Sequence, residues 1–223
     1  MTDPPSAPPA WPDRWLSEDP LPSEPFPILA NWLTEAFEDG RQPSPHAVAL
    51  ATVDAAGDPA VRMVLVQAIE ADAGALVFHS HRDSPKGREL AAHPRASAAF
   101  HFSALGRQAR VSGPVGHVAD VESDAYFATR PVDSQIGAWV SRQSEPLESR
   151  AALVAAMERR AAAFGVDLAA PWPSPAIPRP RGWGGFRLRA DRIELWHSRP
   201  GRVHDRAAWQ RTGSGWTSQR LQP

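Results

Sequence analysis

The sequence has no cysteine, and only one of its 24 basic residues, Lys86, is a lysine. The absence of cysteine excludes disulfides, thiolate metal sites and cysteine nucleophiles, and it is typical of a cytoplasmic protein. No apolar run approaches the roughly 18 residues that a membrane-spanning helix needs. The N-terminus, "MTDPPSAPPAWPDRW", has no basic segment followed by an apolar stretch, so we expect no secretory signal.

An excess of charge of either sign is also missing, because 24 Lys and Arg face 25 Asp and Glu, which gives a net charge of -1. No overall field favours a nucleic-acid partner, and any site for an anion must be local. The hydrophobic content of 42% and the length of 223 residues fit a soluble protein with one sizeable core.

Proline is concentrated in two places. Nine of the 24 prolines precede Ile28, so residues 1–25 are expected to form a flexible arm, or one draped over the fold. Residues 26–223 are expected to form a single domain, with a second proline-rich loop at 170–182 before the C-terminal strands.

Hydrophobic periodicity predicts an α+β fold with an antiparallel barrel or sheet. Helical spacing begins at Ile28 and stops at Gly40, and residues 46–70 are typical of a hairpin with Asp54 to Pro59 at its tip. Further strands are predicted over 75–80, 96–102 and 107–118, further helices over 84–93, 121–130 and 146–164, and three or four strands after residue 183.

The segment "SPKGREL" predicts a helix start, with Ser84 as the cap and Pro85 at the first helical position. Lys86 then faces the positive end of the helix dipole, which costs about 0.3–1 kcal/mol unless an anion is bound there. Free amides and an ammonium together suit a phosphate. A solvated surface lysine is the alternative.

Alternation along "VRMVLVQ" puts Arg62, Val64 and Val66 on one face of a strand. If that face is buried, Arg62 needs a partner, and a phosphate would suit its guanidinium; otherwise it is an edge-strand arginine. His79 and His81 lie at strand spacing, but no carboxylate falls at a matching third position, so we expect no metal site.

The stretch "YFATRPVDSQIGAWVSRQSE" brings several anion-binding groups together. Tyr126 and Arg130 share a helix face, and Ser134 is expected in a turn begun by Pro131, a set that suits a phosphate or carboxylate, although such pairs are common in surface packing. In "ELWHSRPGRVHDR", Trp196 ends one strand, and Arg202, His204 and Arg206 are expected on one face of the next, where a planar anion would offset their charge.

Taken together, the sequence resembles the FMN-dependent pyridoxamine 5'-phosphate oxidases from about Ile28 to Pro223. The blocks that carry the resemblance are "RMVLV", "SPKGREL", "RQARVSG", "YFATRPVDSQIGAWVSRQS", "WGGFRL", "IELW", "RVHDR" and "RLQP". The resemblance implies a homodimeric split β-barrel with flanking helices and an FMN at each of two interface sites. It also implies oxidation of pyridoxine or pyridoxamine 5'-phosphate to pyridoxal 5'-phosphate, with O2 reduced to H2O2.

The same resemblance implies roles for individual residues. The expected FMN contacts are Arg62, Met63, Val64, Leu65, Gln67, His79, Ser80, Lys86, Gln108, Gln143, Ser144, Trp196 and Arg206. The expected substrate contacts are Gln67, Tyr126, Arg130, Ser134, Arg202 and His204, of which Arg202 and His204 lie over the pyridine ring as the catalytic pair.

Three departures from the family pattern bear on the substrate. Gln67 stands where the family usually has a phosphate-binding lysine, Pro85 stands where it usually has an arginine, and the basic N-terminal stretch is not recognisable. Related oxidases of phenazine biosynthesis share the barrel and tend to lack that lysine. The alternatives are therefore a flavin oxidase of another small aromatic, such as a dihydrophenazine, and a flavin-binding protein without turnover.

Overall fold

A computed structural model describes residues 16–17, 19–169, 175–213 and 215–223. Its centre is an antiparallel barrel in which β4 (Arg95–Phe102), β1 (Ala47–Val53), β2 (Pro59–Glu70), β3 (Ala75–His81), β6 (Trp183–Arg189) and β5 (Arg107–His117) are neighbours in that order. The barrel closes because β4 also pairs with β5. The predicted hairpin is confirmed, since β1 and β2 pair in register from Val53 and Pro59 onward.

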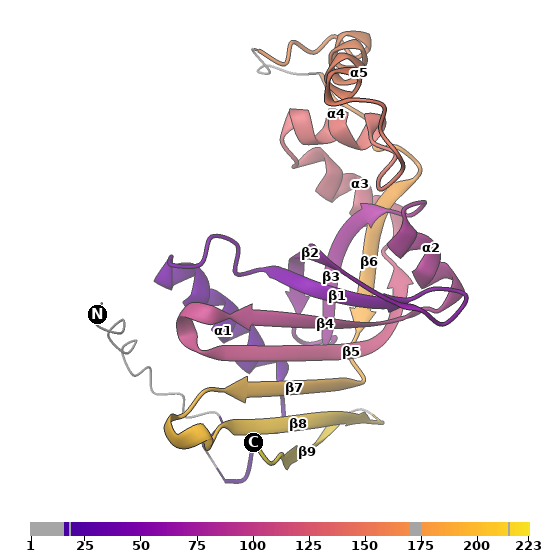
Figure 1. Cartoon of the computed structure of the whole chain (residues 1–223). Coiled ribbons are helices and arrows are strands. Elements are labelled where there is room, and N and C mark those ends of the chain that lie inside the picture. The colour runs from indigo at the N-terminus through magenta and orange to yellow at the C-terminus, as the bar shows by residue number, and fades with distance from the viewer. Residues whose placement is uncertain (1–15, 18, 170–174, 214) are drawn as a thin grey trace.

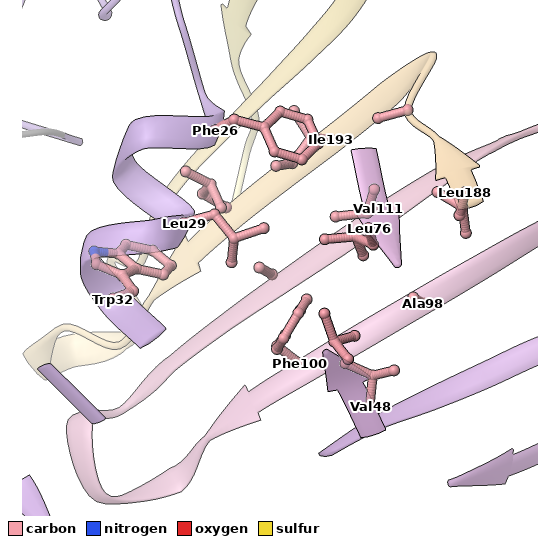
Figure 2. Packing of buried hydrophobic residues seen from close by; sticks show 14 of the residues in the cluster. Phe26, Leu29, Trp32, Val48, Leu76, Ala98, Phe100, Val111, Leu188 and Ile193 are labelled. Atoms are coloured by element: carbon pink, nitrogen blue, oxygen red, sulfur yellow. The ribbon is translucent and has the colours of Figure 1, made fainter. Parts of the chain in front are cut away.

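The barrel core is covered by α1 (Phe26–Asp39), the first predicted helix. Phe26, Leu29 and Trp32 recur at helical spacing, and none is exposed to solvent. Phe26 lies beside Ile193 (Figure 2), and the Trp32 ring meets Phe102 of β4 edge-on. Burying three such side chains stabilises the fold by about 1.5–3 kcal/mol each. The helix ends at Gly40, whose φ of 67° is left-handed, a conformation that glycine adopts without the steric clash of a Cβ.

The strands β7 (Arg192–His197), β8 (Asp205–Thr212) and β9 (Gly215–Arg220) extend the sheet from β5, away from the helical end (Figure 1). With β6 they make four C-terminal strands, which confirms the predicted three or four. The described part of the proline-rich arm lies against them, since Leu16 is fully buried and the Trp209 indole donates to the Pro22 carbonyl over 2.8 Å. Of the two arrangements expected for the arm, flexible or draped over the fold, the described residues 16–17 and 19–25 have the second.

Three helices stand together above the barrel: α3 (Asp120–Ala128), α4 (Val132–Val140) and α5 (Arg150–Ala163) (Figure 1). The expected turn at Ser134 is wrong, because Pro131 is the N-cap of α4 and Ser134 lies in its first turn. The helix expected from residue 146 begins only at Arg150, because Ser149 is extended and its hydroxyl caps the Ala152 amide. No helix in the described ranges is long and apolar enough to cross a membrane.

Candidate active site

A cavity of about 740 Å³ lies between β2, β3, the first turn of α2 (Pro85–Ala92) and the corner where α3 meets α4. Most of the predicted site residues before residue 150 line it together. They are Met63, Val64, Leu65, Gln67, His79, Ser80, Lys86, Tyr126, Arg130, Ser134 and Gln143. Segments 80 residues apart in the sequence therefore meet at one site, as the expected ligand contacts require.

Lys86 is the most unusual residue of this cavity. Ser84 caps α2 by accepting from the Gly87 amide, and Pro85 fills the first helical position, so the predicted helix start is confirmed. The Lys86 side chain does not extend into solvent, because the residue is only 7% exposed and its Nζ donates to Ser80 Oγ, Ser84 Oγ and Gln143 Oε1. Burial lowers the pKa of Lys86, and the nearby Arg62 lowers it further.

All three partners of the Lys86 ammonium are neutral oxygens. No described carboxylate forms an ion pair with it, although a cation buried at a helix N-terminus is stabilised mainly by a negative charge. The sequence left a surface lysine open as the alternative, and the burial of Lys86 excludes it. The site has the composition of a receptor for an anion.

Arg62 has a different environment. Its guanidinium donates to Glu89 Oε2 over 2.6 Å, to the Thr52 hydroxyl and to the Leu50 carbonyl, and it does not line the cavity. The half-buried arginine is thus paired with a carboxylate of α2. A contact between Arg62 and a phosphate stays a prediction.

The other end of the cavity is aromatic and cationic. The guanidinium carbon of Arg130 lies 4.7 Å from the Trp183 ring centre and 5.5 Å from that of Phe127. Its Nη1 is buried without a partner among the described residues. Tyr126 stacks on His79 with ring centres 4.1 Å apart. An unpartnered guanidinium nitrogen beside a phenol and the Ser134 hydroxyl can bind an anionic group.

The charge of the cavity is positive. Lys86 and Arg130 both line it, whereas no Asp or Glu is among its described lining residues. The two histidines do not change this, because burial lowers the pKa of His79 to about 4 and lowers that of His81 as well. Both imidazoles are neutral near pH 7. Among the described residues, no cluster of three His, Asp or Glu could hold a metal ion.

Three of the remaining predicted residues, Gln108, Trp196 and Arg206, form a second group on β5, β7 and β8, which we call the Trp196 row. Gln108 pairs with Trp196, and Trp196 pairs with Arg206, so the three lie side by side across three strands. Arg206 donates to the buried Glu194 over 2.7 Å, and the His204 ring lies 4.7 Å from Trp196. None of these residues lines the cavity.

The expected placement of Arg202 and His204 on a strand is wrong. β8 begins at Asp205, and Arg202 belongs to the short 3-10 turn Pro200–Arg202, where Gly201 and Arg202 have φ values of 68° and 63°. The Arg199 amide donates to the His204 imidazole and closes this turn. The turn interrupts the strand that the sequence predicted through residues 202–206. Of Arg202, His204 and Arg206, only Arg206 therefore lies on a strand. Arg202 itself is exposed at the turn.

Sequence reasoning missed several residues of the site. One is Trp183, whose ring packs against the Arg130 guanidinium. Another is Gly185, on the same strand, where an added Cβ would lie 2.9 Å from His79 Nε2, so no side chain fits there. The "WGG" block was a signal for this close packing. Glu89, Glu194 and Gln135 hold functional residues in place, but a single polar residue in a helix or strand gives no such signal. Ser144, also predicted, follows Gln143 with a φ of 72°.

The closed antiparallel barrel with its flanking helices defines the class of protein as a split barrel. The same fold is found in an FMN-binding protein from Nostoc punctiforme, with a TM-score of 0.71 and 17% identity over 93% of this chain and 100% of that one. A family model described as pyridoxamine 5'-phosphate oxidase matches residues 33–162, and one described as the pyridoxine 5'-phosphate oxidase C-terminal dimerisation region matches residues 183–223. The chain belongs to the pyridoxamine 5'-phosphate oxidase family, which is a family of oxidoreductases, and it carries that family's dimerisation region.

Individual relatives agree with this assignment. The chain is 48% identical to the pyridoxine/pyridoxamine 5'-phosphate oxidase of Rhodopseudomonas palustris (strain HaA2), over 89% of this chain and 90% of that protein. It is 49% identical to the enzyme of the same name from Nitrobacter winogradskyi, over 90% of each chain. PhzG from Burkholderia lata 383, solved in complex with tetrahydrophenazine-1-carboxylic acid, is similar with a TM-score of 0.80 and 33% identity, over 92% of this chain and 95% of that one.

Proposed function

We propose that the protein is an FMN-dependent oxidase that converts pyridoxine or pyridoxamine 5'-phosphate to pyridoxal 5'-phosphate. The proposal is carried by one observation: two separate cations, Lys86 and Arg130, line the same cavity, and no carboxylate is among its described lining residues. A cofactor with a phosphate and a substrate with a phosphate need two anion sites in one space. The names of relatives near 48% identity support the same reaction.

The residues present fit an FMN. The buried Lys86 ammonium, the Ser80 hydroxyl and the Gln143 amide converge at the start of α2 and would hold the phosphate. The exposed apolar side chains of Met63 and Leu65 line the same cavity and would lie against the flavin ring. When bound, FMN would supply the redox chemistry: the substrate would lose a hydride from C4' and a proton from its hydroxyl or amine, and the two electrons would pass to O2, which with two protons gives H2O2. The alcohol substrate would give the aldehyde directly, whereas the imine from the amine substrate would take up water and release ammonia.

The protein's own groups would bind and orient the substrate. Arg130, Tyr126 and Ser134 would hold its phosphate, and Gln67 would donate a neutral hydrogen bond in place of the usual lysine. Anchoring the phosphate restricts the position of the reacting carbon, which lowers the entropic cost of reaching the transition state. Arg202, as a permanent cation, would lie over the pyridine ring together with His204.

A complete site needs a second chain. The Trp196 row and the turn with Arg202 and His204 do not line the cavity of their own chain. In a two-fold dimer, surfaces that lie apart on one chain can meet across the interface. We infer that the Trp196 row of one subunit completes the cavity of the other, with one FMN in each. The dimerisation region at residues 183–223 contains most of this row.

The test is turnover by the FMN-loaded protein. With pyridoxine 5'-phosphate and O2 we expect one aldehyde and one H2O2 per substrate, followed by aldehyde absorbance and a peroxidase-coupled assay. A preparation that binds FMN tightly but yields no aldehyde with either vitamin phosphate would contradict the proposal. Failure to bind FMN at all would contradict the cofactor assignment as well.

A second candidate is oxidation of a reduced phenazine, which two observations favour. Gln67 replaces the phosphate-binding lysine, and PhzG, a structure of similar fold, was solved with tetrahydrophenazine-1-carboxylic acid. Retention of Arg130, Tyr126 and Ser134 around one end of the cavity favours the phosphorylated substrate. The two candidates can be compared by bleaching of the bound flavin under anaerobic conditions. If a dihydrophenazine bleaches it and pyridoxine 5'-phosphate does not, the phenazine becomes the favoured substrate.

A further inference from the structure

Gln135 occupies the corner between α3 and α4 that carries the proposed substrate-phosphate subsite. It belongs to α4, it is only 7% exposed, and its side chain folds back toward α3. Its Nε2 donates to the Arg130 carbonyl over 2.7 Å and approaches the Ala128 carbonyl at 3.5 Å. A buried side chain of one helix thus satisfies backbone groups at the end of another.

These carbonyls need such a partner. The last carbonyls of a helix receive no hydrogen bond from the helix itself, because no further turn follows them. They usually accept from a glycine-based cap, from water or from side chains. The C-cap of α3, Thr129, is right-handed, and the last turn of the helix has no basic residue. The Tyr126 carbonyl accepts from the Thr129 hydroxyl, the Phe127 carbonyl accepts from the Arg130 amide, and Gln135 donates to the carbonyls of Ala128 and Arg130.

The same corner sets the spacing of the three anion-binding groups. Tyr126 lies in the last turn of α3, Arg130 lies between the helices, and Ser134 lies in the first turn of α4. The Arg130 guanidinium is fixed by the Trp183 and Phe127 rings, whereas its backbone is fixed by Gln135. A change in the angle between α3 and α4 would move Ser134 away from the other two.

We propose that Gln135 is a positioning residue for the substrate phosphate: its amide ties α4 to the Arg130 backbone and so keeps Tyr126, Arg130 and Ser134 at the spacing that one phosphate requires. This inference rests on the proposed function of that subsite. Gln135 itself does not line the cavity of about 740 Å³; it lines a second cavity of about 820 Å³ that shares Thr129, Arg130 and Pro131 with the first. Its effect is therefore expected on the binding of the phosphate and not on the redox step or on FMN.

The test is Gln135→Met in the FMN-loaded protein, a change that keeps the length of the side chain and removes its donors. We expect KM for pyridoxine 5'-phosphate and the inhibition constant of inorganic phosphate to rise by about 10-fold, the equivalent of one lost buried hydrogen bond. We expect kcat and the FMN dissociation constant to stay within about twofold of wild type, since no FMN or ring contact is changed.

Gln42→Met is the matched control. Gln42 makes the same kind of bond, from its amide to the His101 carbonyl over 3.0 Å, and it does not line the cavity. It should lower thermal stability without changing KM. Gln135→Glu, which places a carboxylate against the two carbonyls, provides the same comparison if the methionine variant does not fold, and its KM should rise at least as much.

The outcomes separate the two proposals. If wild type turns over pyridoxine 5'-phosphate but the Gln135 variants keep its KM and the phosphate inhibition constant, the Gln135 inference is wrong and the proposed function stands. Equal losses in kcat, KM and FMN affinity would show a general structural role and also overturn it. If wild type neither turns over the vitamin phosphate nor binds inorganic phosphate, the subsite and both proposals fail.

Discussion

The ammonium of Lys86 lies 2.7 Å from the amide oxygen of Gln143, a contact that joins the first turn of α2 to the segment after α4. It brings the only lysine of the chain into a buried position with neutral partners. The cation is therefore prepared for an anionic ligand, because such a ligand would replace the hydration that Lys86 has lost. This burial is the structural basis for our proposal that Lys86 binds the FMN phosphate.

Replacing Lys86 with methionine should weaken FMN binding. A charge-assisted hydrogen bond to a phosphate contributes about 1.5–3 kcal/mol, so the dissociation constant of FMN should rise by about 10- to 150-fold. The measurement is a titration of apoprotein that follows quenching of flavin fluorescence. Arg95→Met is the control, since Arg95 lies on β4 with a side chain 61% exposed and outside the cavity, and it should leave FMN affinity unchanged. An unchanged affinity in Lys86→Met would show that the phosphate binds elsewhere.

Replacing Gln67 with lysine should improve the binding of a phosphorylated substrate. Gln67 lines the cavity from β2 and is exposed, so an ammonium there adds a third cation to the cavity, after Lys86 and Arg130. We expect KM for pyridoxine 5'-phosphate to fall about 10-fold, with kcat nearly unchanged. Gln219→Lys adds the same charge on β9 and should have no effect. A KM that does not fall in Gln67→Lys would mean that residue 67 does not reach the phosphate.

The lowered pKa of His79 predicts a loss of stability in acid. Its folded-state pKa of about 4 lies below the ordinary 6.5, so between these pH values the unfolded chain binds a proton that the folded chain does not. Stability should therefore fall as pH decreases from 6.5 to 4, by up to about 3 kcal/mol from this group. Chemical denaturation across that range measures it. His79→Phe keeps the ring against Tyr126 and should reduce the pH dependence, and equal slopes in both proteins would contradict the shift.

The helix start at Ser84, the hairpin around Asp54 and the four C-terminal strands could be predicted from the sequence, because each depends on local backbone preferences. Gly40 marks the end of α1 and Pro85 the first position of α2 through their own backbone preferences, and the periodicity of α1 identifies its buried face. These features need no knowledge of distant residues. Tyr126 and Arg130 line one cavity, as the family resemblance implied. The expected shared helix face is wrong, because α3 ends at Ala128 and Arg130 lies beyond it.

What could not be predicted depends on contacts between distant parts of the chain. Arg62 has a phosphate or a carboxylate as equally suitable partners, and only the packing of α2 on β1 selects Glu89. The turn at Gly201 moves Arg202 off the strand because two consecutive residues adopt positive φ, which alternation alone does not show. Gln135 looks like any polar residue of a helix until α3 is placed beside it.

The central claim is that each active site is built from two chains, and mixing two inactive variants tests it most directly. Arg130→Met impairs the cavity, and Arg202→Ala impairs the turn next to the Trp196 row, so neither homodimer should turn over pyridoxine 5'-phosphate at low concentration. Dissociating and reassociating an equal mixture should restore about a quarter of the wild-type activity, because half of the dimers are mixed and each mixed dimer has one intact site. Activity that stays at the level of the separate variants would show that Arg130 and Arg202 act within one chain and would contradict the shared site.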